Sequence, residues 1–123
     1  MSQPYYESTI LRVGAETDEL FEGGVLILFA EPVPDALESV SVIHRPAGEP
    51  TAEMRPGDVL RLGDSTVELR AVGERADENL RSLGHIVVYV TVPDGGGLAP
   101  GAVHADGTLG VPRAGARLVL SRP

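Results

Sequence analysis

The stretch SVSVIHR at residues 39–45 predicts a short strand that carries a histidine at its end. Its valines and its isoleucine favour a buried, pleated environment. The strand cannot continue as a central one beyond residue 45, because Pro46 lacks a backbone N–H and Gly48 is a turn residue. We therefore expect His44 where a strand leaves the core, held by the strand yet accessible to a partner.

Short apolar runs separated by turn residues continue along the rest of the chain. The 15 glycines and 10 prolines are spread over the 123 residues rather than clustered. They punctuate runs of Val, Leu and Ile, which is typical of a compact all-β domain. Besides the stretch above, we expect strands over residues 5–13, 25–29, 59–62, 66–72, 86–92, 102–104 and 117–120.

One segment, residues 76–83, has the pattern of an α-helix. Two acidic residues in its first turn complement the helix dipole, and Leu80 and Leu83 share a face. Gly84 follows directly and is well placed as a C-cap.

These elements predict an all-β fold of about seven to nine short strands and one short helix. A closed or nearly closed barrel is the favoured architecture, with a sandwich as the alternative. Residues 15–21 and 35–38 would add single helical turns, and residues 93–97 a flexible loop. No internal repeat or linker is evident, and the length suits one domain rather than two. We therefore expect residues 1–123 to form a single domain.

The chain is strongly acidic, with 18 acidic and 10 basic residues and a formal net charge of −8. All ten basic residues are arginine, and they form no basic stripe. This charge argues against a nucleic-acid partner, because an acidic surface repels phosphate backbones. It suits docking against a basic protein, although acidity that only keeps the protein soluble is an equally simple interpretation.

The sequence contains no sign of membrane insertion or export. The N-terminus lacks the positively charged start and apolar run of a signal peptide, and no apolar run is long enough to span a bilayer. We therefore expect a soluble, cytoplasmic protein.

Several kinds of chemistry are excluded by residue type. The chain has no cysteine and no lysine, which removes disulfides, thiolate nucleophiles, cysteine metal sites and Schiff bases. There is no G-x-S-x-G elbow for a serine nucleophile. The glycines at 95–97 lack the helix and lysine of a phosphate-binding loop. Covalent catalysis would have to use histidine, serine, threonine, tyrosine or a carboxylate.

The three histidines are His44, His85 and His104, and their separations match no short chelate motif. A metal site assembled from all three in space is an open alternative that the spacing does not support, so no metal or cofactor is predicted. A neutral imidazole is also a competent nucleophile near pH 7. A phosphoryl carrier would need one exposed ring nitrogen, a hydrogen bond on the other nitrogen, and donors around the phosphoryl oxygens. A purely structural histidine at a strand end is the simpler interpretation.

Four stretches of the chain form a recognisable set. The N-L-x-x-L-G-H and P-G-x-V-H elements are specific in combination, although each alone would be weak. The set spans about residues 5–120 and resembles the glucitol/sorbitol-specific enzyme IIA component of the bacterial phosphotransferase system. The stretches are TILRVG at 9–14 with the strand at 26–29, DALE at 35–38 leading to VIH at 42–44, residues 56–73 leading to NLRSLGH at 79–85, and PGAVH at 100–104.

The resemblance implies a barrel-like phosphotransferase component with a covalent phosphohistidine intermediate. Members of the family accept a phosphoryl group from the histidine phosphocarrier protein and pass it to the IIB part of a sugar permease with IIB and IIC components. The phosphorylated histidine of the family falls on His44. His85 and His104 match motif positions, which implies supporting hydrogen bonds, although turn-fixing roles are nearly as consistent. Arg45 would contact the phosphoryl group or be solvated.

Two alternatives stay open from the sequence. The first is a non-catalytic barrel that binds a partner or regulates, which would be favoured by a fully buried His44 with both ring nitrogens bonded. The second is a small metal-dependent enzyme, which would require the three histidines to converge.

Overall fold

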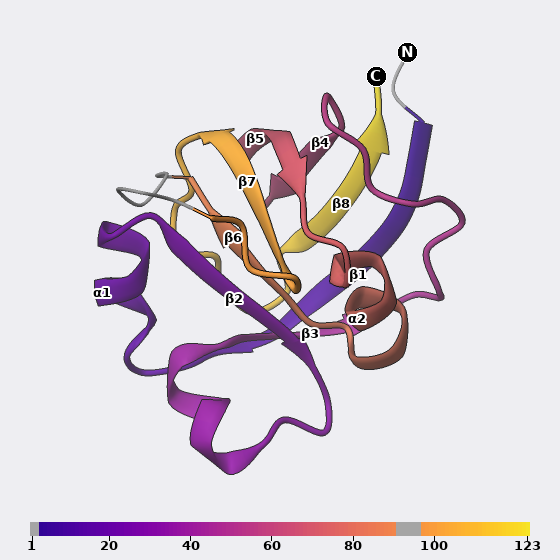
Figure 1. Cartoon of the computed structure of the whole chain (residues 1–123). Helices are drawn as coiled ribbons and strands as arrows, with labels where there is room; N and C mark the ends of the chain where they lie inside the picture. Colours follow the sequence, from indigo (N-terminus) through magenta and orange to yellow (C-terminus); the bar gives the residue numbers. More distant parts are fainter. Residues whose placement is uncertain (1–2, 91–96) are drawn as a thin grey trace.

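Eight strands close into a barrel in the computed structural model, which describes residues 3–90 and 97–123 (Figure 1). Their order around the barrel is β1-β3-β2-β6-β7-β5-β4-β8, and β8 pairs with β1. Neighbouring strands are antiparallel except for the pairs β2–β3 and β6–β7. The prediction of a closed all-β barrel is confirmed. The strands are β1 (Gln3–Val13), β2 (Val25–Ala30), β3 (Val42–Pro46), β4 (Val59–Leu62), β5 (Ser65–Val72), β6 (Ile86–Tyr89), β7 (Ala102–Gly107) and β8 (Arg117–Arg122).

The described residues contain two short α-helices and one 3₁₀-helix, where one short helix was predicted. The helix α2 (Ala76–Leu83) has the predicted bounds, and Gly84 caps it in the left-handed conformation at φ 62°. The helical turns expected near residues 15–21 and 35–38 are observed as α1 (Thr17–Glu22) and the 3₁₀-helix η1 (Asp35–Val40).

The strand predicted over residues 39–45 starts later than expected. Ser39 and Val40 end η1, and β3 begins only at Val42. The predicted strand over residues 86–92 is observed as β6 up to Tyr89. Residues 91–92 of the predicted strand and residues 93–96 of the predicted loop lie outside the described part of the chain.

The interior of the barrel is filled by aliphatic side chains that alternate along the strands. These residues are almost completely removed from water, and such burial is the main favourable contribution to folding. Eight of them come from strands β1, β2, β4, β5 and β8: Ile10, Leu26, Leu28, Leu60, Leu62, Leu69, Leu118 and Leu120.

The barrel consists of two halves with the same topology, β8-β1-β3-β2 and β4-β5-β7-β6. In each half a long strand with a β-bulge (β1 or β5) leads into a short α-helix and then into two strands that pair in parallel. The prediction of no internal repeat is therefore wrong. The available signal was the pattern V-G-x-x-x-D-E, which occurs at residues 13–19 and again at 72–78.

An ionic cluster around the buried Asp58 links the C-terminal strand to the loop before β4. Asp58 accepts a hydrogen bond of 2.8 Å from the Tyr5 hydroxyl and one of 2.9 Å from the Arg55 backbone N–H. Arg122 donates to Asp58 at 3.3 Å and lies over the Tyr5 ring. Burial alone would raise the pKa of Asp58, but hydrogen bonds from Arg122, Tyr5 and Arg55 outweigh it and hold that pKa below its ordinary value.

We expect Asp58→Ala to lower the free energy of unfolding at pH 7 by about 2–4 kcal/mol, because it leaves buried donors unpaired. Since the folded-state pKa is depressed, the contribution of Asp58 is present above the unfolded value of 3.8 and disappears as the pH falls through the folded value. Urea unfolding at several pH values should show that the difference in free energy of unfolding between wild type and variant becomes smaller at acid pH. The control is Asp64→Ala on the exposed β4–β5 turn, and equal losses for the two variants would contradict the assignment.

Candidate functional site

His44 lies inside the barrel wall and is completely buried. Its Nδ1 is 2.8 Å from the hydroxyl oxygen of Ser8 on β1, and its Nε2 is 2.7 Å from the backbone carbonyl of Gly84 after α2. The ring therefore connects β1, β3 and the turn between α2 and β6. The next residue along β3, Arg45, is exposed.

The two hydrogen bonds define the tautomer of His44. A carbonyl oxygen can only accept, so Nε2 carries the hydrogen and donates it to Gly84. Burial lowers the pKa of His44 below 6.5, and the hydrogen bond to Gly84 opposes this only in part. The ring is consequently neutral at pH 7, and Nδ1 accepts a hydrogen bond from the Ser8 hydroxyl. In this state Nε2 has no free electron pair.

The other half of the barrel shows what the fold itself requires at this place. In the first half, His44 pairs with Ile10, the last residue of β1 before its bulge. In the second half, Ala105 pairs with Leu69, the last residue of β5 before its bulge. Two residues before the same point, the long strands carry Ser8 and Val67. Both Ala105 and Val67 are buried. The apolar pair satisfies the barrel, so the hydrogen-bonded Ser8–His44 pair is a departure that packing does not demand.

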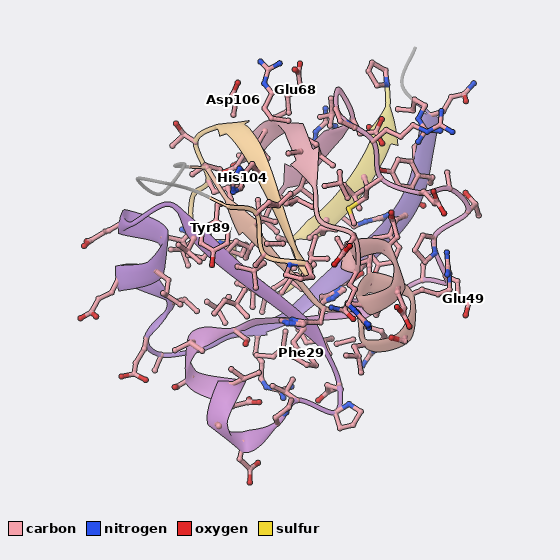
Figure 2. All side chains as sticks on the ribbon, viewed as in Figure 1. Phe29, Glu49, Glu68, Tyr89, His104 and Asp106 are labelled. Atoms are coloured by element: carbon pink, nitrogen blue, oxygen red, sulfur yellow. The ribbon has the colours of Figure 1, made fainter. Side chains whose placement is uncertain are left out.

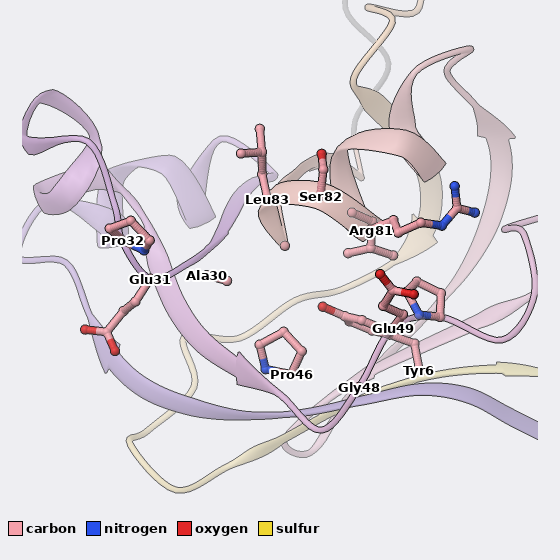
Figure 3. Close-up of a pocket in the computed structure, with 13 residues that line it drawn as sticks. Tyr6, Ala30, Glu31, Pro32, Pro46, Gly48, Glu49, Arg81, Ser82 and Leu83 are labelled. Atoms are coloured by element: carbon pink, nitrogen blue, oxygen red, sulfur yellow. The ribbon is translucent and has the colours of Figure 1, made fainter.

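Figure 3 shows a cavity of about 360 Å³, which Tyr6 and Gly84, both neighbours of the His44 ring, help to line. Gly84, whose carbonyl accepts the hydrogen bond from His44, is part of its lining. The only basic side chain in the lining is that of Arg81, and the lining also contains the acidic residues Glu31 and Glu49. The full lining is Tyr6, Ala30, Glu31, Pro32, Pro46, Gly48, Glu49, Pro50, Leu80, Arg81, Ser82, Leu83 and Gly84.

The expectation that His44 is accessible to a partner is wrong for this conformation. The Gly84 carbonyl occupies Nε2, and the imidazole has no exposed surface. The sequence could not reveal this, because the covering group comes from a turn 40 residues away. A buried histidine with both nitrogens bonded is also the observation that favours a non-catalytic barrel.

The other two histidines, His85 and His104, have partners other than His44. His85 follows Gly84, but its Nδ1 is 2.9 Å from the Leu28 carbonyl and its ring stacks on Phe29 at 4.2 Å. His104 lies on β7 beside Tyr89, and strands β2 and β6 separate β7 from β3 (Figure 2). A hydrogen bond from either ring to His44 is not formed in this structure, because Ser8 and Gly84 take both of its nitrogens, whereas a contact of His85 or His104 with a phosphoryl group stays a prediction.

The described residues also lack a metal-binding cluster. No group of three or more His, Cys, Asp or Glu side chains within 3–90 and 97–123 is arranged to hold a metal ion. The convergence that a metal-dependent enzyme would require is therefore not observed there. Arg45, considered as a phosphoryl contact, does not line the cavity, whereas Arg81 does.

Three residues of the site were missed by the sequence analysis. Ser8 and Tyr6 alternate with Ile10 on the buried face of β1, so two hydroxyl side chains at alternate positions before Ile10 were the available signal. Gly84 was predicted only as a helix cap. Its carbonyl contact depends on the closure of the barrel, which local sequence does not encode.

Fold and site together define a class of protein: a small closed barrel with a hydrogen-bonded histidine beneath a cavity. Within that class, the sequence profile of the family described as PTS system glucitol/sorbitol-specific IIA component matches residues 5–117. The chain therefore belongs to this family, and the resemblance is confirmed. No helix in the described part of the chain is long and apolar enough to cross a membrane.

Individual relatives agree with the family match. The PTS system glucitol/sorbitol-specific EIIA components of Shigella flexneri and Escherichia coli (strain K12) are each 38% identical to the chain over 106 residues, covering 85% of this chain and 83% of the relative. The crystal structure of a PTS system IIA component from Enterococcus faecalis V583 superimposes with a TM-score of 0.81 and 23% identity. That likeness, over 91% of this chain and 96% of the other, supports the fold.

The buried, neutral His44 predicts that stability depends on pH. Because its folded pKa lies below 6.5, the unfolded state binds the proton first as the pH falls. We expect the wild type to lose up to about 1.4 kcal/mol per pH unit as the pH falls below about 6.5. His44→Gln should remove this slope in urea unfolding, whereas the control His104→Gln should keep it. Parallel slopes for wild type and His44→Gln would contradict a neutral buried ring.

Gly84 is expected to tolerate no side chain. A Cβ there would lie 2.5 Å from the Ala30 Cβ and 3.2 Å from His44 Nε2, whereas at Gly63, with a similar φ of 58°, the nearest atom would be 3.8 Å away. Both alanine variants should lose about 1–2 kcal/mol for the left-handed backbone. Gly84→Ala should lose a further 1–3 kcal/mol or so for the steric clash. Equal losses in urea unfolding would show that the neighbours of Gly84 move aside easily.

Proposed function

We propose that this chain is a phosphoryl carrier of a sugar phosphotransferase system, with His44 as the residue that is phosphorylated. Family membership supports the general role. The observation that carries the choice of His44 is the polar Ser8–His44 pair beside a cavity, at a place where the other half of the barrel has Val67 and Ala105.

The geometry favours Nε2 as the nucleophilic atom. Nε2 faces Gly84, which lines the cavity, whereas Nδ1 faces Ser8, which does not. For the reaction, Nε2 must separate from the Gly84 carbonyl, and the ring proton must move to Nδ1. The Ser8 hydroxyl can accept from Nδ1–H as readily as it donates to Nδ1, so both tautomers keep a partner on that side.

The transfer step then conserves atoms and charge. The P–N bond of a phosphohistidine on the donor protein breaks, and its electron pair stays on the donor nitrogen. The electron pair of His44 Nε2 forms the new P–N bond. The proton stays on Nδ1, and this N–H donates a hydrogen bond to the Ser8 hydroxyl. A neutral ring is the nucleophile, so the low pKa of His44 keeps it reactive at pH 7 once the carbonyl has moved.

The donor in this proposal is the histidine phosphocarrier protein, and the acceptor is the IIB part of a glucitol/sorbitol permease with its IIC component. The chain would act in the cytoplasm, where both partners are accessible. Its net charge of −8 favours a donor with a basic docking face.

A non-catalytic barrel is the second candidate, because His44 is buried with both nitrogens bonded. In that case the Ser8–His44–Gly84 bonds would serve stability alone, and the chain would take up no phosphate. The two candidates therefore differ in one measurable property.

We expect phosphoenolpyruvate, enzyme I and the histidine phosphocarrier protein together to add one acid-labile phosphate to the chain. His44→Ala should reduce labelling to background, because the nucleophile is absent. His85→Ala and His104→Ala should still be labelled, since neither ring contacts His44. Labelling that survives the loss of His44 would contradict the proposal, and the absence of labelling in the folded wild type would favour the non-catalytic barrel.

A further inference from the structure

The hydroxyl of Tyr6 is buried without a hydrogen-bond partner among the described residues. Tyr6 is only 3% exposed, so its hydroxyl is cut off from bulk solvent. A buried polar group without a partner is unfavourable and rare in folded proteins. The neighbouring Tyr5 shows the usual arrangement, because its hydroxyl donates to Asp58 at 2.8 Å.

The unpaired hydroxyl lies at the candidate site. Tyr6 lines the cavity beside Gly84, and Figure 3 shows its hydroxyl directed toward the middle of the lining residues, between Pro46 and Glu49. The Tyr6 ring meets the His44 ring edge-on, with 6.2 Å between the centroids and 69° between the planes. The other buried hydroxyl without a partner in the described chain is that of Ser41, which lines no cavity near His44.

From this geometry we infer that the Tyr6 hydroxyl is a substrate-binding donor, which hydrogen-bonds to an oxygen of the phosphoryl group carried by His44. The inference rests on the proposed function. A phosphoryl group on Nε2 would extend from the His44 ring into the cavity that Tyr6 lines. Its anionic oxygens need donors, and a donor fixed in a buried site is more effective than water.

The environment of Tyr6 suits a donor. Burial raises the pKa of its phenol above the ordinary value, so the hydroxyl keeps its proton at physiological pH. The unpaired hydroxyl thus destabilises the free protein and becomes satisfied only when the phosphoryl group arrives. This is the pattern expected of a binding group retained at the expense of stability.

The test compares Tyr6→Phe with the matched control Tyr5→Phe. Each variant and the wild type is phosphorylated with the phosphorylated histidine phosphocarrier protein, and the initial rate and the half-life of phosphorylated His44 are measured. For Tyr6→Phe we expect the initial rate to fall roughly ten- to hundredfold and the half-life to shorten, since a hydrogen bond to a charged group is lost. Tyr5→Phe should leave both values near those of the wild type.

Thermal unfolding of the unphosphorylated proteins supplies the second readout. Tyr6→Phe should melt at the wild-type temperature or above it, because no hydrogen bond is removed. Tyr5→Phe should melt lower, because Asp58 loses a partner. Wild-type rate and half-life in Tyr6→Phe would overturn the role of Tyr6 while leaving His44 as carrier. A lower melting temperature with unchanged phosphorylation would assign the hydroxyl to stability and overturn it as well. No labelling of the wild type would overturn the carrier function itself.

Discussion

The site depends on two hydrogen bonds that hold one imidazole between Ser8 and Gly84. Ser8 belongs to the first strand, His44 to the third, and Gly84 to the turn after the second α-helix, so the ring joins segments that meet only when the barrel closes. Because both nitrogens are bonded, the ring has a defined tautomer and orientation. The same bonds occupy Nε2, the atom proposed as the nucleophile, because its hydrogen is shared with the Gly84 carbonyl.

The proposed carrier role would benefit from such a resting state. In this conformation His44 is neutral and shielded from solvent, and the proposed transfer would require displacement of the Gly84 carbonyl. The phosphorylated form proposed above would also give a partner to the Tyr6 hydroxyl, which has none in the described chain and lies at the cavity. Favourable interactions would then be kept for the phosphorylated form, which is how binding groups favour one state of a reaction over another.

Features that depend on neighbouring residues were predicted correctly from the sequence, whereas features that depend on distant segments of the chain were not. Alternation and turn residues were enough to predict an all-β chain of short strands and α2 with its Gly84 cap, because each of these elements depends on neighbouring residues. The exposure of His44 was predicted wrongly, since burial there depends on a turn 40 residues away. The repeat was overlooked because its halves share only the V-G-x-x-x-D-E pattern and diverge at Ser8–His44 and Val67–Ala105. The alternation of Tyr6 and Ser8 on the buried face of β1 was visible in the sequence, but the absence of a hydrogen-bond partner for the Tyr6 hydroxyl became evident only from the structure.

The most direct test of the central claim follows the imidazole nitrogens of His44 by long-range ¹H–¹⁵N NMR before and after incubation with the phosphorylated histidine phosphocarrier protein. The account predicts a neutral ring protonated at Nε2 in the free protein. After transfer it predicts a phosphorus coupling at Nε2 and a proton on Nδ1 toward Ser8. An unchanged His44 spectrum, with phosphorus on His85 or His104 or on no histidine at all, would contradict it.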